Sequence, residues 1–397
     1  MNEIKNQGLE GVVAATTRLS SVDGEAGELL IAGFPVEELA PRATFEETTW
    51  LLWNGSLPTA DELATFRRRL AGRRALPAAT LDLLRAAARR RVPAMDALRM
   101  GAGTLSLIEG SGESREDALT LVAAFPSIVA AFWRLLRGEE PLPPREDLGH
   151  AASFLYLLTG EEPAAERSRG LETYLNTVSD HGLNASTFTA RVIVSTRSDL
   201  ISAITGAVGA LKGPLHGGAP GPALDMVFEI GSPERAEPVL REKLARGERL
   251  MGFGHRVYRV RDPRADVLAA AAERFYRHGG DKELYELARS VEVTALRLLR
   301  ESKPDRRLDT NVEFYTALLL HGLGLPTELF TPLFAVGRVA GWTAHALEQL
   351  ATGRLIRPQS EYVGERGRRW VAVGEREGMV GPTDYSHAVG LRHPRAS

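Results

Sequence analysis

Residues 200–214 read LISAITGAVGALKGP, and they show the pattern that most of the chain follows. From Ile201 to Leu211, large apolar side chains recur every three or four positions, which predicts one buried face of an α-helix. The glycines and alanines between them would let a second helix pack closely against this one. The helix is expected to end at residues 212–214, where Lys-Gly-Pro breaks the pattern.

Helical periodicity, interrupted by glycine and proline, continues from residue 35 to residue 353 and predicts an all-α fold. Thr44 and Glu47 have the three-residue spacing of a capping box, which predicts the start of a helix. Residues 329–347 contain a proline and Arg338, and we expect them to form a buried helix and not a membrane span.

Strand character is confined to the N-terminal region. Residues 12–15 and 29–32 are short apolar runs, and residues 22–25 are acidic and contain a glycine, as turns often do. We therefore expect a short N-terminal β-hairpin made of these two strands.

A stretch near the C-terminal half differs in composition from its surroundings. Residues 218–323 are more charged and contain helical patterns of their own, for example at 263–277 and 282–300. This difference predicts a smaller domain inserted into a larger one.

The composition is that of a globular protein and excludes several classes of function. Of 397 residues, 44% are apolar and 25% are charged, which allows a sizeable buried core. The net charge of −2 argues against a nucleic-acid-binding protein, although 44 of the 49 basic residues are arginine. The absence of cysteine excludes disulfides, thiolate nucleophiles and cysteine-ligated metals. Residues 1–9 lack the apolar core of a signal peptide, so we expect a cytoplasmic protein.

Three of the nine histidines lie in glycine-containing segments that are unusual for core packing, namely SDHGLN, GPLHGG and GFGHRVY. These are His181, His216 and His255. Glycine lets the backbone approach a ligand closely, and histidine can exchange a proton near neutral pH. One such histidine is explained equally well by a structural role, but three indicate a shared active site. A histidine-only metal site is a weaker alternative, because no H-x-x-x-H pair or accompanying carboxylate is present.

Arg338 is the only formal charge between Glu328 and Glu348. A buried guanidinium needs an anion, which can be a carboxylate of the protein or of a ligand. Arg264 occupies the first turn of a predicted helix, where a positive charge opposes the helix dipole. Such unusual settings make these two arginines candidates for anion binding, and Arg357, which precedes a proline, is a third.

Three motifs resemble the signatures of the citrate synthase family. They are GPLHGG at 213–218, GFGHRVY at 252–258 with DPR at 262–264, and NVEFY at 311–315. The resemblance runs almost the whole chain and is similar to the shorter bacterial and archaeal members, which include 2-methylcitrate synthases. It implies a cytoplasmic homodimer with a two-domain, all-α fold. The large domain would comprise residues 1–217 and 324–397, and the small, CoA-binding domain would comprise residues 218–323 and close over the cleft.

The resemblance also implies an activity and a set of residues for it. The enzyme would condense acetyl-CoA or propionyl-CoA with oxaloacetate and release CoA, without a metal or other cofactor. Three side chains would be catalytic, namely His216, His255 and Glu313. Oxaloacetate would be held by His181, Asn184, His255, Arg264, Arg338 and, from the neighbouring subunit, Arg357. CoA would contact Leu250, Met251, Gly252, Phe253, Gly254 and Asn311.

These residue types suit the chemistry. Removal of a proton from the carbon next to a thioester requires a base, which Glu313 can be, and a donor for the enol oxygen. His216 precedes a predicted helix that opens at about Pro220, and a helix N-terminus favours the neutral, donating imidazole. His255 is a second donor, for the oxygen of the attacked ketone.

Glu313 is a departure, because the family pattern has aspartate at this position. The extra methylene moves the carboxylate by roughly 1 Å, a shift that can cost on the order of 10²-fold in rate. We expect the local backbone to compensate. The alternative is a paralogue that keeps the ligand pocket, has weak turnover, and acts as a binding or regulatory protein.

Overall fold

The computed structural model describes residues 7–9, 11–108, 112–217, 220–255, 257–278 and 281–375. The chain divides into two compact units, Met1–Ile356 and Arg357–Ser397. The first unit contains all the α-helices and strands of the described residues, which confirms the predicted all-α class with a small N-terminal sheet. Short 3₁₀ turns also occur, at Gln7–Leu9, Leu105–Leu107 and Thr327–Leu329 in the first unit and at Val373–Glu375 in the second.

The N-terminal sheet has three antiparallel strands in the order β1 (Ser20–Asp23), β2 (Glu28–Ile31) and β3 (Phe34–Pro35). The predicted second strand is confirmed, but the predicted strand at residues 12–15 is wrong, since Val13 is 84% exposed and no ladder forms there. The predicted turn at 22–25 is also wrong in part. Residues 22 and 23 belong to β1, where Val22 pairs with Leu29, and the turn is made by residues 24–27. The Asp23 carboxylate accepts the backbone N–H groups of Glu25 and Ala26, which fixes where the turn begins.

The predicted capping box at Thr44 is confirmed. The hydroxyl of Thr44 accepts the N–H of Glu47, and the Glu47 carboxylate accepts the N–H of Thr44, so α2 (Phe45–Asn54) begins there. Gly55, with φ +80°, ends it in the left-handed conformation. The other helices up to residue 211 are α1 (Val36–Leu39), α3 (Ala60–Ala71), α4 (Ala78–Arg89), α5 (Ala94–Thr104), α6 (Ser114–Leu136), α7 (His150–Thr159), α8 (Ala165–Val178), α9 (Ala185–Ser195) and α10 (Leu200–Leu211).

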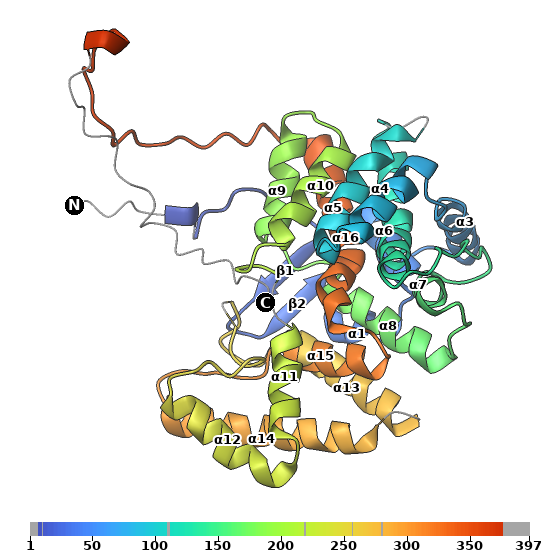
Figure 1. Ribbon diagram of the computed structural model, residues 1–397, viewed down its shortest axis with the longest axis vertical. Helices are drawn as coiled ribbons and strands as arrows, with labels where there is room; N and C mark the ends of the chain where they lie inside the picture. Colours follow the sequence, from blue (N-terminus) through green and yellow to red (C-terminus); the bar gives the residue numbers. More distant parts are fainter. Residues whose placement is uncertain are drawn as a thin grey trace. The chain divides into compact units, whose positions relative to one another are not determined.

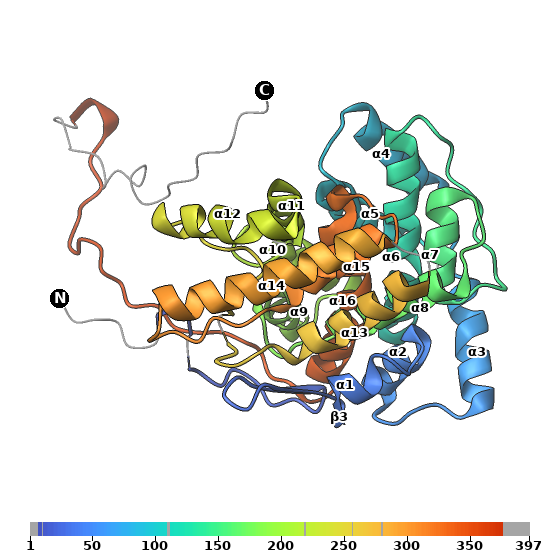
Figure 2. The same cartoon turned by 90° about the horizontal axis from the view of Figure 1, so that it is seen from below.

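Five helices follow between residues 220 and 322; they lie together at the lower side of the first unit in Figure 1, and in Figure 2, seen from below, they lie toward the viewer. Contacts join α12 to α14, α13 to α15 and α11 to α15. Their bounds are α11 (Pro220–Ile230), α12 (Pro233–Ala245), α13 (Pro263–His278), α14 (Lys282–Ser302) and α15 (Val312–Gly322). The division into domains at 217/218 and 323/324 stays a prediction, and residue 218 lies outside the described residues.

The predicted buried helix at 329–347 is α16 (Phe330–Thr352), which packs against α6, α8 and α9. Arg338, Thr343 and His345 are among its almost fully buried residues. Two glycines allow the close approach: a Cβ at Gly337 would lie 2.6 Å from Val178, and one at Gly341 would lie 2.2 Å from the Ser179 carbonyl oxygen. Helix α16 is therefore held against the segment that follows α8.

Within the described residues, one helix is long and apolar enough to cross a membrane, namely α6. Of its apolar 18-residue window, 78% is buried inside the fold. The apolar side chains of α6 therefore serve the protein core.

Candidate active site

Seven of the predicted site residues meet in one cavity of about 250 Å³ in the first unit. They come from different elements: the loop after α8, the N-cap of α9, the loops after α10 and before α13, and helices α13, α15 and α16. The seven are His181, Asn184, His216, His255, Arg264, Glu313 and Arg338. The remaining wall is apolar for the most part and includes Val178, Leu215, Val257, Val312 and Phe334.

His255 is oriented by the backbone that follows it. Its Nδ1 accepts the N–H groups of Val257 and Tyr258, at 3.0 and 3.1 Å, and these two contacts are shorter than the 3.4 Å between Arg264 Nη2 and His255 Nε2, so the proton of the neutral ring is on Nε2. Burial and the nearby charge of Arg264 lower the pKa of His255 to about 4. The ring is therefore a neutral donor at physiological pH.

His216 is oriented by the first turn of α9. The N–H of Ser186 donates to His216 Nε2 at 3.3 Å, which leaves the proton of the neutral ring on Nδ1. The Ser186 hydroxyl lies 2.7 Å from the same nitrogen and also accepts the indole N–H of Trp342 at 3.0 Å. Burial, assisted by Arg338, lowers the pKa of His216 to about 4. The predicted helix at Pro220 is confirmed as α11, although residues 218 and 219 lie outside the described residues.

The sequence interpretation assigned no role to Ser186, Trp342 or Tyr258. Tyr258 lies at hydrogen-bonding distance from His181, with 3.0 Å between its hydroxyl and Nε2. Burial lowers the pKa of His181 well below its usual range, and the charges of Arg264 and Arg338 act in the same direction. The place of Tyr258 in GFGHRVY, three residues after His255, could have indicated that it lies near the site. Nothing local to Ser186 or Trp342 indicates this, because their contact depends on tertiary packing.

Glu313 lies in the first turn of α15, behind its N-cap residue Asn311. The Asn311 side chain accepts the N–H of Glu313 at 3.0 Å and donates to the Gly254 carbonyl at 2.8 Å. The N–H of Asn311 donates to the Gly252 carbonyl at 3.0 Å, so this residue ties the start of α15 to the loop at 252–254. Burial raises the pKa of Glu313 above its usual 4.5, although Arg264 opposes this. It is the only carboxyl among the described residues of the cavity wall, and its raised pKa makes it a better proton acceptor.

The residues predicted to contact CoA do not line this cavity. Leu250 and Phe253 are buried in the core, and the Phe253 ring lies 5.4 Å from that of Phe314. Gly252 and Gly254 have φ values of +88° and +80°, which side chains rarely adopt. The loop presents mainly backbone groups next to Asn311, and its role in CoA binding stays a prediction.

The two arginines of the cavity differ in their partners. Arg264 is 4% exposed and is paired with Asp262, at 3.0 Å from Nε and 2.8 Å from Nη2. Arg338 is 1% exposed, donates from Nε to the Val178 carbonyl at 2.6 Å, and lies over the Phe334 ring. No carboxylate oxygen of a described residue lies within 4.0 Å of its guanidinium nitrogens. A buried arginine without a contacting carboxylate suits an anionic ligand.

One further predicted position, Arg357, is not among the residues that line this cavity. Arg357 is the first residue of the second unit, and its side chain is exposed. Arg256, inside the GFGHRVY motif, lies outside the described residues. Among the residues that the structure does describe, no cluster of three histidine or acidic side chains could hold a metal ion.

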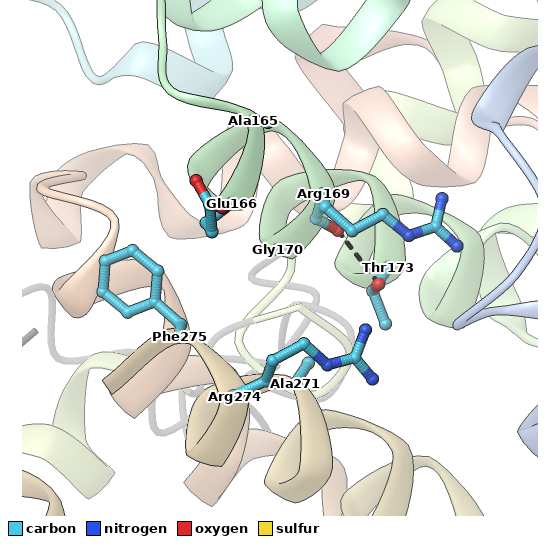
Figure 3. Close-up of a pocket in the computed structure, with 8 residues that line it drawn as sticks. All are labelled: Ala165, Glu166, Arg169, Gly170, Thr173, Ala271, Arg274 and Phe275. Atoms are coloured by element: carbon cyan, nitrogen blue, oxygen red, sulfur yellow. Dashed lines mark hydrogen bonds between the residues drawn. The ribbon is translucent and has the colours of Figure 1, made fainter. Parts of the chain in front are cut away.

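A second cavity, of about 240 Å³, lies between α8 and α13 (Figure 3). Arg169 in its wall is occupied by Glu172 and by the carbonyls of Pro41 and Ala43. Gly170 and Ala271 are among the other residues that line it. The wall contains no histidine, and the combination of donors, base and arginines occurs in the first cavity.

Comparison with known proteins shows the family of this chain. The model of the family "Citrate synthase, C-terminal domain" matches residues 8–359. Citrate synthase 2 of Bacillus subtilis is 42% identical over 93% of this chain and 99% of the relative. The 2-methylcitrate synthase of Shewanella oneidensis is 38% identical over 94% of this chain and 99% of the relative. A solved structure of Thermoplasma acidophilum citrate synthase, a ternary complex with carboxymethyl coenzyme A and oxaloacetate, is 31% identical with a TM-score of 0.84, covering 94% of this chain and 99% of that one.

Proposed function

The chain belongs to the citrate synthase family and is an enzyme that condenses an acyl-CoA with oxaloacetate, and we propose that the cavity around His216, His255 and Glu313 is its active site. One observation carries the proposal. Two neutral imidazoles and a carboxylate of raised pKa line the same small cavity as two buried arginines. A dicarboxylate and a thioester that must lose a proton need this combination.

Oxaloacetate is held by its two carboxylates and its keto oxygen. Arg338, whose guanidinium has no contacting carboxylate among the described residues, takes one carboxylate, and Arg264 with His181 forms the rest of the anion pocket. Asn184 contributes to the same wall. In a homodimer, Arg357 of the partner subunit completes the pocket. Burial of these groups fixes the keto acid for attack.

The reaction begins at the acyl-CoA. The carboxylate of Glu313 removes a proton from the carbon next to the thioester carbonyl, and the Nδ1–H of His216 donates to the enolate oxygen that forms. The enol carbon then attacks the keto carbon of oxaloacetate, while the Nε2–H of His255 donates to the oxygen that becomes the new hydroxyl. Water hydrolyses the resulting thioester and releases CoA. Each step uses side chains of this chain and water, so the proposal includes no metal or prosthetic cofactor.

The proposal extends to the rest of the assembly. The loop Leu250–Gly254 and Asn311 supply backbone and amide groups to CoA, and residues 218–323 form the small domain that closes over the cleft to exclude water. The protein is a cytoplasmic homodimer. The ligands named for the Thermoplasma acidophilum complex support the pairing of a CoA derivative with oxaloacetate.

A CoA-release assay tests the proposal. The protein is mixed with oxaloacetate and either acetyl-CoA or propionyl-CoA, and free CoA is detected with a thiol reagent. Because the chain has no cysteine, the protein itself gives no signal. Turnover that depends on oxaloacetate and is lost in Glu313→Ala is expected. Turnover no faster than that of Glu313→Ala would refute the assignment, and the ratio of kcat/KM for the two thioesters identifies the preferred acyl group.

A further inference from the structure

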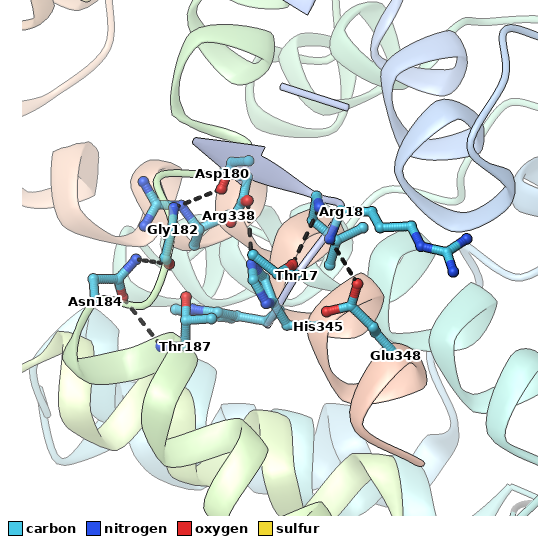
Figure 4. A network of polar contacts seen from close by, with 12 residues as sticks. Thr17, Arg18, Asp180, Gly182, Asn184, Thr187, Arg338, His345 and Glu348 are labelled. Atoms are coloured by element: carbon cyan, nitrogen blue, oxygen red, sulfur yellow. Dashed lines mark hydrogen bonds and ion pairs between the residues drawn. The ribbon is translucent and has the colours of Figure 1, made fainter. Parts of the chain in front are cut away.

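A chain of buried polar side chains leads from the surface to the edge of the proposed oxaloacetate pocket (Figure 4). Glu348, which is partly exposed, is ion-paired with Arg191. Arg191 Nε donates to His345 Nδ1 at 3.0 Å, and His345 Nε2 lies 3.2 Å from Asp180 Oδ2. Asp180 directly precedes His181, and its charge acts on Arg338. The three inner members, Arg191, His345 and Asp180, are between 0% and 2% exposed.

The direction of these hydrogen bonds fixes the protonation of His345. An arginine nitrogen can only donate, so His345 Nδ1 must be an acceptor and carries no proton. The single proton of the ring is therefore on Nε2 and is donated to Asp180. Burial would raise the pKa of Asp180, but the hydrogen bond from His345 and the charge of Arg338 hold it below its usual range. Asp180 is thus an anion whose Oδ2 is held by a donor of fixed orientation.

Helix α16 carries Arg338, His345 and Glu348 on one face. Arg338, Gly341, His345 and Glu348 are spaced by three, four and three residues, which is the spacing of neighbours on a helix surface. A Cβ at Gly341 would lie 2.9 Å from Asp180 Oδ1, so the absence of a side chain there lets the carboxylate lie against the helix. Asp180 is therefore close to Arg338 without pairing with it, since their charged atoms are more than 4.0 Å apart.

We propose that His345 is a positioning residue that restrains the Asp180 carboxylate, so that Arg338 stays free to bind oxaloacetate. An aspartate that loses its donor in a buried site gains most by pairing with the nearest cation, which here is Arg338. Such a pair would occupy the guanidinium that the substrate needs. Arg191 contributes by keeping the proton of His345 on the side of Asp180. This inference rests on the proposed oxaloacetate site, and it adds residues that do not themselves line the cavity.

Two neutral amides at position 345 separate this role from a general loss of packing. In His345→Gln the amide reaches as far as imidazole Nε2 and can still donate to Asp180. In His345→Asn the amide corresponds to Nδ1, so it can meet Arg191 but falls short of Asp180. We expect His345→Asn to raise the KM and the dissociation constant for oxaloacetate by at least about tenfold, equivalent to about 1.4 kcal/mol. His345→Gln is expected to stay within about threefold of the wild type, and the KM for acyl-CoA is expected to change less than about threefold in both variants.

A double variant gives the decisive comparison. In Asp180→Asn/His345→Asn there is no released carboxylate to capture Arg338, so the KM for oxaloacetate should fall back toward that of Asp180→Asn alone. If the single variants acted only by damaging the packing, their effects on the KM for oxaloacetate would instead add in the double variant. Should His345→Asn fail to fold, as judged by thermal unfolding, Arg191→Lys serves the same purpose. It keeps the charge opposite Glu348, removes the Nε donor, and is expected to raise the KM for oxaloacetate.

Several results would overturn the inference. Equal oxaloacetate affinity in the Gln and Asn variants is one, and a parallel rise in the KM for acyl-CoA is another. The inference would also be overturned by a higher KM for oxaloacetate in the double variant than in His345→Asn, or by an unchanged KM in Arg191→Lys. A wild-type protein that does not bind oxaloacetate at all would refute the proposed function itself, which is a different outcome.

Discussion

Shortening the proposed base by one methylene is the most informative perturbation of this site. In Glu313→Asp the carboxylate withdraws by roughly 1 Å from the reacting carbon, and a displacement of that size costs on the order of 10²-fold in rate. The start of α15 cannot move forward to compensate, because two hydrogen bonds hold Asn311. Its N–H donates to the Gly252 carbonyl at 3.0 Å, and its side-chain amide donates to the Gly254 carbonyl at 2.8 Å. The loop and α15 are also in close contact, since a Cβ at Gly252 would lie 2.9 Å from Phe314. We therefore expect kcat to fall by about 10²-fold, or about 2.7 kcal/mol in activation free energy.

The assay is steady-state CoA release with oxaloacetate at saturation. Glu313→Gln keeps the length of the side chain and removes the base, so it should lose more activity than Glu313→Asp. Glu328→Asp makes the same change at an exposed position outside the cavity and should leave kcat unchanged. A Glu313→Asp enzyme as fast as the wild type, or faster, would refute the reasoning. That result would mean that the backbone places this residue for aspartate and that glutamate is the weaker base here.

Three further predictions follow from burial and charge. The value of kcat/KM, measured by thioester absorbance, should fall in acid with an apparent pKa above 4.5, because protonation of Glu313 removes the base; the same acid limb in the residual activity of Glu313→Gln would instead show that His216 or His255 titrates there. Arg338→Leu should raise the KM for oxaloacetate by about 10²-fold and lower kcat, since a charge-assisted contact is lost; unchanged kinetics would remove Arg338 from the site. His150 is buried with its pKa lowered to about 3, so the unfolded chain takes up a proton below pH 6.5 that the folded chain cannot, and stability falls by about 3 kcal/mol at pH 4; in His150→Phe the melting temperature should fall less between pH 7 and pH 4, and an equal fall in both proteins would contradict this.

The sequence was sufficient where the signal is local or where a residue is out of place. The helix at 200–211 and the capping box at Thr44 depend on neighbours a few residues apart, and both are confirmed. Arg338 could be identified because a lone guanidinium in an apolar helix needs an anionic partner, and it lies in the cavity wall. The strand at 12–15 failed because an apolar run alone does not supply a pairing partner, whereas Val22 has one in β2.

The relation of Asp180 to His345 could not be predicted in this way. These residues are 165 positions apart, and the hydrogen bond exists only because α16 packs against the segment after α8. The same holds for Ser186 and Trp342, which are 156 positions apart; Ser186 contacts His216, and Trp342 donates to Ser186. Residues that orient a catalytic group carry no unusual local pattern, so they are found only when tertiary contacts are known.

The clamp formed by Asn311 has a consequence for the timing of catalysis. One side chain joins the proposed CoA loop to the helix turn that carries Glu313. If that loop contacts CoA, as proposed, the base and the recognition element travel as a single rigid piece. Glu313 then reaches its working position only when the CoA part of the thioester has bound to the loop. Proton removal therefore depends on CoA recognition, and a thioester without the CoA part is not deprotonated by Glu313.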